Sequence, residues 1–324
     1  MADWRVEDGI AEERAVCIEN DAIVAARIRW PGELAAGAVV AARLVARHTG
    51  AARGTARLAD GTEVLVSRLP RDASEGAAIT LEITRAAIGE PGRVKRAQAR
   101  PTDAGLRSAP TLFDMLRDEG HDPVRVRSFP GGEWDALMAE AFERRLDFTG
   151  GAIVLSPTPA MTLIDIDGTL PPRTLSLSAV PAIAAALRRF DMGGSVGIDF
   201  PTLPDKADRR AVDDALTHAL AGFAHERTAM NGFGFVQIVS RNGGPSILHR
   251  VAHRRMAAAA RQLLRRAERV AGAGTILIAA HPALASHLSE DRIAELSRRT
   301  GRATRITTDP ALAPEAGFAQ AVEA

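Results

Sequence analysis

Three aspartates in the middle of the chain are the residues best suited to hold a metal ion. Asp165 and Asp167 lie in the apolar run 161–168, and Asp199 lies near the end of the run 195–200. Two like charges held close together are unfavourable unless a cation lies between them or one carboxyl group is protonated. Carboxylate oxygens are ligands that Mg²⁺ and Mn²⁺ prefer, and such an ion can activate water and neutralise charge on a phosphate ester. The residue types therefore favour metal-dependent hydrolysis of a phosphate ester.

The elements that position these aspartates are predicted from the apolar pattern around them. Three apolar runs predict strands, at residues 150–155, 161–168 and 195–200. Between the second and third, Val180, Ile183, Ala184 and Leu187 form the apolar stripe of a helix over residues 176–189. Strands joined by such a helix usually lie parallel and close together in one sheet. We therefore expect Asp165 and Asp199 to emerge at the same edge. The alternative is that these acids cap a helix or pair with Arg209 or Arg210.

An ordered run of motifs resembles the catalytic core of the ribonuclease E/G-type endoribonucleases. The motifs are Gly-Gly-x-Ile-Val at 150–154, Leu-Ile-Asp-Ile-Asp at 163–167, the amphipathic helix, Asp-x-Gly-Gly at 191–194, Ile-Asp-Phe at 198–200 and Arg-Arg-x-Val at 209–212. The resemblance implies that Asp165 and Asp199 hold a magnesium ion on a DNase I-like fold. The family usually has asparagine where this chain has Asp167, which we take as a third ligand or a neighbour of the ion.

The resemblance also implies an activity. It is cleavage of single-stranded RNA phosphodiesters, in RNA processing or decay, by in-line attack of metal-activated water that leaves a 5′ phosphate. Manganese in place of magnesium stays open. Basic residues that the resemblance or the charge pattern offers as contacts for RNA are Arg144, Arg209, Arg210, Arg241, Lys95 and Arg96. For Arg144, an ion pair with Glu140 one turn earlier is the competing expectation.

Two other functions remain open. The first is a non-catalytic RNA-binding relative of the same family. The second follows from Asp-Ile-Asp-Gly-Thr-Leu at 165–170, which resembles the nucleophile loop of haloacid-dehalogenase-type phosphatases. In that case Asp165 would attack phosphorus directly.

The family resemblance implies an α+β fold with several subdomains. These are an N-terminal hairpin of an RNase H-like part (1–34), an OB-like barrel (35–90), a linker with a shortened RNase H-like and 5′-sensor region (91–149), a DNase I-like catalytic domain (150–248) and a small C-terminal α/β domain (249–324). Several short β-rich runs separated by glycine and aspartate turns support the barrel. Arg93, Lys95 and Arg96 begin the basic stretch that we interpret as the linker.

Three features depart from the family pattern. No aromatic residue lies between Ala35 and Ala109, so the barrel lacks rings on which bases could stack. The Cys-Pro-x-Cys segment of the family is missing, and the single cysteine, Cys17, excludes a zinc link between protomers. The region of the 5′ sensor is short, so we expect sensing of the 5′ end to be reduced or absent. A homodimer through another surface stays open.

Composition adds limits to these expectations. A chain of 324 residues with 46% hydrophobic and 25% charged residues has the composition of a globular protein of two or three domains. The net charge of +1 gives no general attraction for nucleic acid, so any RNA-binding field must be local. No apolar run approaches the ~20 residues that span a bilayer, and no signal-peptide pattern is present. We expect a cytoplasmic protein without membrane contact.

The remaining segments follow the same pattern rules. We expect a hairpin of strands 14–18 and 22–28, a helix over about 206–226 that carries both His218 and His225, and a strand over 233–240. A long helix over 251–270 follows, with most of its arginines facing outward.

Overall fold

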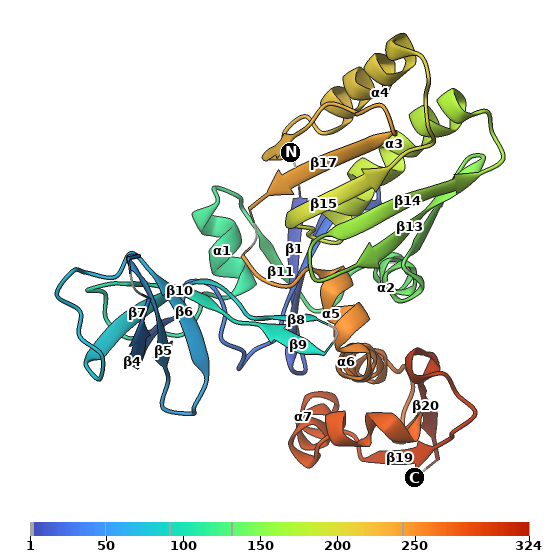
Figure 1. Cartoon of the computed structure of the whole chain (residues 1–324). Helices are drawn as coiled ribbons and strands as arrows, with labels where there is room; N and C mark the ends of the chain where they lie inside the picture. The colour runs from blue at the N-terminus through green and yellow to red at the C-terminus, as the bar shows by residue number, and fades with distance from the viewer. Residues whose placement is uncertain (1–2, 49, 91, 131, 242, 324) are drawn as a thin grey trace.

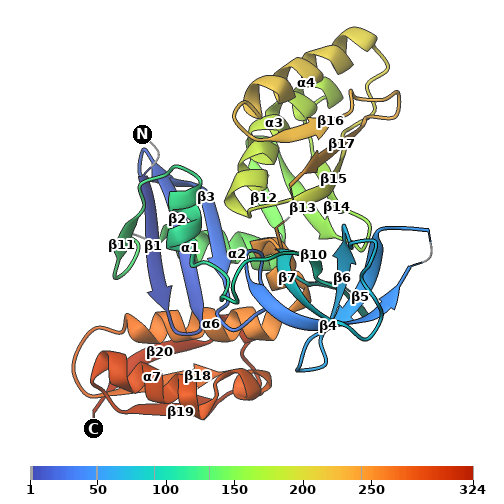
Figure 2. The same cartoon turned by 90° about the vertical axis from the view of Figure 1, so that its left-hand side faces the viewer.

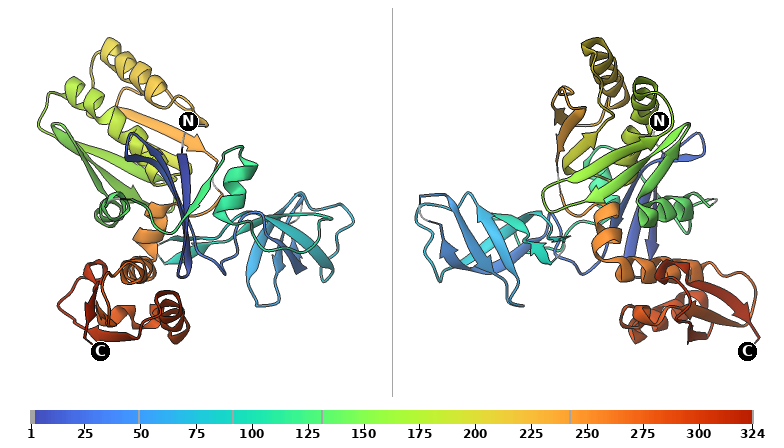
Figure 3. Two further views of the ribbon diagram at one scale, coloured as in Figure 1. Left: turned by 180° about the vertical axis from the view of Figure 1, so that it is seen from behind. Right: turned by 45° about the vertical axis from the view of Figure 1, so that its right-hand side comes forward.

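The computed structural model describes residues 3–48, 50–90, 92–130, 132–241 and 243–323. It is an α+β protein with several subdomains, as expected (Figure 1). A mixed sheet with its helices forms the upper part, a small barrel lies to one side and an α/β unit lies below. The view from behind shows the barrel and this unit well apart (Figure 3).

The barrel is closed by strands in the order β10-β6-β5-β4-β7. Its strands are β4 (Val39–Arg47), β5 (Arg53–Arg57), β6 (Glu63–Ser67), β7 (Ala78–Arg85) and β10 (Gln98–Pro101). Aliphatic side chains such as Leu44, Val64 and Leu81 fill its interior. The prediction of a barrel is therefore confirmed, although its last strand lies beyond residue 90.

We predicted that the basic stretch after residue 91 is a linker. This prediction is wrong, because the stretch forms strands. Strands β8 (Ile88–Glu90) and β9 (Arg93–Lys95) form a hairpin, and β10 then closes the barrel by pairing with β6 and β7. The prolines and glycines around these short strands favoured a linker in the sequence analysis, so the strands were not predicted. Because Ala97 and Ala99 are buried in the barrel core, the stretch is fixed to the fold.

A four-stranded sheet in the order β11-β1-β2-β3 connects the subdomains. Its strands are β1 (Asp3–Gly9), β2 (Glu12–Glu19), β3 (Ala22–Arg29) and β11 (Val124–Val126). The β2–β3 hairpin is confirmed. It turns at Asn20 and Asp21, whose φ angles of +49° and +62° suit residues that tolerate the left-handed region. Helix α1 (Leu112–Asp118) packs on one face of this sheet.

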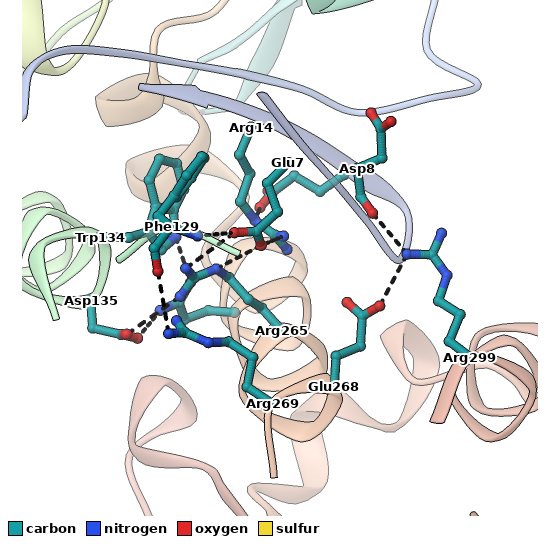
Figure 4. A network of polar contacts seen from close by, with 12 residues as sticks. Glu7, Asp8, Arg14, Phe129, Trp134, Asp135, Arg265, Glu268, Arg269 and Arg299 are labelled. Atoms are coloured by element: carbon teal, nitrogen blue, oxygen red, sulfur yellow. Dashed lines mark hydrogen bonds and ion pairs between the residues drawn. The ribbon is translucent and has the colours of Figure 1, made fainter. Parts of the chain in front are cut away.

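Ion pairs buried beneath this sheet link it to the C-terminal half (Figure 4). Glu7 Oε1 accepts hydrogen bonds from Arg14 Nη1 at 2.7 Å and from Arg265 Nε at 2.9 Å. The side chains of Glu7, Arg14 and Arg265 are 5%, 0% and 1% exposed. Glu7 Oε2 also accepts from the backbone N–H of Phe129 at 3.1 Å. One carboxylate therefore serves two buried guanidinium groups and a buried amide.

The middle of the chain forms a six-stranded sheet in the order β12-β13-β14-β15-β17-β16. The strands are β12 (Arg145–Phe148), β13 (Gly151–Pro157), β14 (Thr162–Gly168), β15 (Gly194–Asp199), β16 (His225–Arg227) and β17 (Phe235–Ser240). Helices α2 (Glu133–Glu143), α3 (Pro172–Arg189) and α4 (Lys206–Ala219) accompany it. Helices α3 and α4 lie on one side of the sheet (Figure 1). Val180, Ile183 and Leu187 of α3 are buried, as the apolar stripe predicted.

Helix α4 is shorter than we predicted. It ends at Ala219, and Gly222 takes a φ of +77°, which lets the chain leave the helix and form β16. His225 therefore lies on a strand and does not share a helix with His218. Phe233 likewise lies in a turn before β17 and not in the strand.

The predicted long helix over 251–270 is two helices. These are α5 (Ile247–His253) and α6 (Arg255–Glu268), which break at Arg254. Its arginines do not all face outward, since Arg261 and Arg265 are 5% and 1% exposed. Arg261 donates to the carbonyl of Ala11 and lies 3.9 Å above the Trp30 ring, so partners within the fold compensate its burial.

The C-terminal unit packs against α6 (Figure 2). It contains β18 (Thr275–Ala280), α7 (Glu290–Thr300), β19 (Thr304–Thr308) and β20 (Phe318–Val322), with the short 3₁₀ helices η1 (Pro282–His287) and η2 (Pro314–Ala316). The sheet order β19-β18-β20 includes an edge strand, β20, that the sequence pattern did not reveal. No helix in the described part of the chain has both the length and the apolarity needed to cross a membrane.

A pH-dependent contribution to stability arises where α5 packs on the β8–β9 hairpin. Burial, then the neighbouring His253, lowers the pKa of His249 from 6.5 to about 4, with Glu90 opposing and Lys95 adding to the effect. Below pH 6.5 the unfolded chain protonates this imidazole while the folded chain does not. We therefore expect this group to lower the free energy of unfolding by at most about 3 kcal/mol as the pH falls from 6.5 to 4.

Urea denaturation of wild type and of His249→Gln at pH 7 and pH 4.5 would measure this term. The variant should lose less stability on acidification than the wild type. Equal losses in both proteins would contradict the assignment.

Candidate active site

Asp165 and Asp199 lie side by side on the uncovered face of the six-stranded sheet. Strands β14 and β15 are parallel neighbours, and Asp165 pairs in register with Asp199. Neighbouring strands are about 4.8 Å apart, and residues in register point to the same face. Along β14 the buried residues alternate with exposed ones, and both aspartates fall on the exposed face. The two acids are neighbours as predicted, but they lie on a face of the sheet and not at its edge, because Asp165 is in the middle of β14.

Both carboxylates are available to bind a ligand. Asp165 Oδ1 accepts a hydrogen bond from the N–H of Ile166 at 3.0 Å. Among the described residues, no arginine, lysine or histidine forms an ion pair with Asp165 or Asp199. Neither acid caps a helix, since the residue before α4 is Asp205. The alternative role as helix caps or partners of Arg209 or Arg210 is therefore wrong.

The donor set fits a hard divalent cation. Two unpaired carboxylates on adjacent strands repel each other, and a cation between them would remove this repulsion. Their oxygen atoms suit Mg²⁺ or Mn²⁺. Asp167 lies two residues further along β14 on the same face, opposite Ala152. The described residues contain no group of three acidic, histidine or cysteine side chains close enough to hold a metal together. Asp167 is thus a neighbour of the pair, and the aspartate pair is the candidate metal site.

Apolar side chains that sequence reasoning missed surround the pair. Phe235 lies opposite Asp199 on β17. A Cβ atom added to Gly197 would come within 2.6 Å of the Phe235 ring, 2.8 Å of the Met161 sulfur and 3.0 Å of Leu163 Cδ2. These three side chains therefore cover Gly197, directly beside the carboxylates. Phe235, Met161 and Leu163 come together only through the register of β14, β15 and β17. The sequence pattern does not predict that register.

Arg209 and Arg210 lie near the start of α4, which follows Asp199 after a short connection. The Arg209 guanidinium donates to the carbonyl oxygens of Leu203 and Pro204, so it holds that connection in place. Arg210 is exposed. Of the two, Arg210 has the freer side chain for a substrate phosphate.

Arg241 is not brought to the aspartates. In the antiparallel pair of β15 and β17, Asp199 lies opposite Phe235 and Gly194 lies opposite Ser240. Arg241 follows Ser240, six residues from Phe235, so it lies roughly 20 Å along the sheet from Asp199. There it lines a separate cavity of about 270 Å³ with Asp191 and Arg27.

Arg144 ends helix α2 in the left-handed conformation, with a φ of +57°. The expected ion pair with Glu140 is wrong, because Glu140 pairs instead with Arg189 at 2.7 Å. The next residue, Arg145, lies in the row of facing positions that crosses the sheet through Val154, Asp165, Asp199 and Phe235. Arg145 was not predicted as a residue near the site, because the sequence pattern did not place β12 beside β13.

Lys95 and Arg96 lie near the barrel and have partners there. Arg96 pairs with Glu63 at 3.1 Å, and Lys95 lies 4.0 Å from Glu90. These contacts offset much of the basic charge that we had expected to follow an RNA backbone.

The segment that resembles a phosphatase loop is not a loop. Asp165, Asp167 and Gly168 all lie within β14, which pairs with β13 on one side and β15 on the other. A nucleophilic aspartate in a phosphatase of this kind would stand in the loop after a strand. The geometry therefore favours two carboxylates displayed across a sheet.

Comparison with known proteins agrees with this geometry. Residues 127–242 match the model of the ribonuclease E/G family. The matched segment contains the whole of the six-stranded sheet and both aspartates. Over this segment the chain is similar to the ribonuclease E/G family.

Curated members of the family are similar to part of the chain. Ribonuclease G of Salmonella typhimurium is 29% identical over 145 residues, which cover 40% of this chain and 28% of the relative. Ribonuclease G of Escherichia coli is 31% identical over 127 residues, 35% of this chain and 25% of the relative. Ribonuclease E of Escherichia coli is 32% identical over 96 residues, 26% of this chain and 9% of the relative. The match thus spans about a quarter of the ribonuclease G relatives.

Proposed function

We propose that this protein is a metal-dependent endoribonuclease that cuts single-stranded RNA. The observation that carries the proposal is the in-register pair Asp165 and Asp199, unpaired on an uncovered sheet face within the segment that matches the ribonuclease E/G family. Relatives that are similar to part of the chain are named ribonuclease G and ribonuclease E. An uncovered face can receive a long polymer, whereas a small phosphate ester is usually bound in a concave pocket.

In this proposal Asp165 and Asp199 hold one divalent ion. When bound, such an ion supplies positive charge for the phosphate oxygens and activates water for in-line attack. Asp167 adds negative charge nearby, which raises the local attraction for the cation. Arg210 and Arg144 are exposed, and we propose them as contacts for substrate phosphates. The products would carry a 5′ phosphate, and we expect the activity to operate on RNA in the cytoplasm. Both carboxylates come from one chain, so the proposal requires no second copy.

A non-catalytic RNA-binding relative is the second candidate. The observation that favours it is the limited match, which leaves the barrel outside the matched segment. In that case RNA would bind at low salt concentration and dissociate at high salt concentration, but it would not be cut.

Metal removal tests the proposal. Labelled single-stranded RNA should be cut in Mg²⁺, should remain intact in EDTA, and should be cut again when excess Mg²⁺ is returned. Gel electrophoresis of the products measures this. A parallel assay with p-nitrophenyl phosphate should show no metal-dependent hydrolysis. Intact RNA in Mg²⁺ would overturn the nuclease proposal, and rapid hydrolysis of the monoester alone would favour a phosphatase.

A further inference from the structure

An exposed phenylalanine, Phe233, lies in the turn before Phe235, the residue that faces Asp199. The side chain of Phe233 is 83% exposed, more than any other large hydrophobic residue in the described part of the chain. Large apolar side chains exposed beside a site often mark a binding surface. Phe233 plays no part in the core, so its ring is free to contact a ligand.

Hydrogen bonds hold the turn that carries Phe233 in one conformation. Asn231 Oδ1 accepts hydrogen bonds from the N–H groups of Phe233 at 2.9 Å and Phe235 at 3.0 Å. Gly234 takes a φ of +91°, and a Cβ atom there would come within 2.4 Å of the Phe200 carbonyl oxygen. The N–H of Phe200 donates to the Gly234 carbonyl at 3.2 Å. The turn is therefore fixed against the residue that follows Asp199.

Register places the turn at the same end of the sheet as the aspartates. Phe235 faces Asp199, so Phe233 lies two residues beyond this pair. On the other side, Gly197 lies two residues before Asp199 and is covered by Met161, Leu163 and Phe235. We call these three side chains the apolar floor. Gly197, beneath the floor, lies roughly 7 Å along β15 from Asp199, and the turn that carries Phe233 lies beyond Asp199 in the opposite direction.

Nucleobases are the ligand that this arrangement fits. A single-stranded RNA whose phosphate lies at Asp165 and Asp199 would carry one base on each side of that phosphate. Bases stack on aromatic and apolar surfaces with little sequence preference. The barrel offers no ring for this purpose, because no aromatic residue lies between Ala35 and Ala109.

We propose that Phe233 and the apolar floor bind the two bases that flank the scissile phosphate. This inference rests on the proposed function, because it takes the phosphate at the aspartates as given. Phe233 is then a positioning residue, which keeps the strand extended across the carboxylates without contributing to the charge of the site.

Binding of a fluorescent single-stranded RNA in EDTA, where no cleavage is expected, tests the proposal. Phe233→Ala should weaken the affinity about 5- to 100-fold, and Phe233→Trp should restore it. Leu163→Ser should weaken binding through the floor. Phe318→Ala is the matched control, because Phe318 is 45% exposed on β20 in the C-terminal unit. In cleavage assays, Phe233→Ala should raise KM more than it lowers kcat.

An abasic substrate separates stacking from a structural role. When the base next to the cut is removed, wild type and Phe233→Ala should bind equally. Equal binding of the two proteins to intact RNA would overturn the inference, as would a change in oligomeric state without a change in RNA affinity. If RNA is never cut but Phe233→Ala still weakens binding, the nuclease proposal fails while the base-stacking surface stands.

Discussion

Asp165→Asn and Asp199→Asn should each lower the rate of RNA cleavage by at least about 10³-fold at saturating RNA and Mg²⁺. Asparagine keeps the shape of each side chain but removes its charge, so one of the two anionic ligands for the ion is lost. Both side chains are exposed and neither forms an ion pair within the described fold, so folding should be unaffected. Single-turnover assays with end-labelled RNA would measure the rates, and circular dichroism would confirm the fold.

Asp147→Asn is the matched control for these variants. Asp147 lies on β12, on the same sheet, and is paired with Arg145 at 2.9 Å. Its substitution should change the rate by no more than about threefold, since exposed pairs contribute little. If Asp165→Asn or Asp199→Asn retained a tenth or more of the wild-type rate, the two-carboxylate site would be wrong.

Glu7→Ala should destabilise the fold by about 3–5 kcal/mol, because it leaves two buried guanidinium groups without their shared carboxylate. Arg14 and Arg265 are almost fully buried and both donate to Glu7 (Figure 4). Burial already lowers the pKa of Arg265, with the Glu7 carboxylate as the largest opposing influence. Since Glu7 joins β1 to α6, the loss should also loosen the contact between the N-terminal sheet and the C-terminal half.

Urea denaturation of Glu7→Ala and of Asp8→Ala would measure this effect. Asp8 is the next residue on β1, and its ion pair with Arg125 is about half exposed. Asp8→Ala should therefore cost no more than about 1 kcal/mol. Similar losses for the two variants would show that the buried network does not link the two parts of the chain.

The candidate site could be predicted from the sequence because its geometry is local. Asp165 and Asp199 lie on strands joined by one helix, and the apolar runs that predict those strands also fix their parallel order. The barrel was predictable for a similar reason, from repeated short runs and turns. Its last strand was missed because β10 is only four residues long and lies among basic residues.

Features that depend on distant partners could not be predicted. Arg261 and Arg265 read as surface residues of a basic helix, yet Trp30 and Glu7 from the N-terminal sheet bury them. The family resemblance implied that Arg241 contacts RNA, because it follows the strand predicted at 233–240. The antiparallel direction of β17 carries Arg241 to the other end of the sheet and brings Phe235 opposite Asp199.

Direct measurement of the ion tests the central claim best, that Asp165 and Asp199 together hold a divalent cation. Mn²⁺ can be titrated into wild type and into the double variant Asp165→Asn/Asp199→Asn, each in complex with a single-stranded RNA, with free Mn²⁺ followed by electron paramagnetic resonance. We expect the wild-type complex to retain a tightly bound Mn²⁺ that the double variant lacks. Equal Mn²⁺ binding by the two complexes would contradict it.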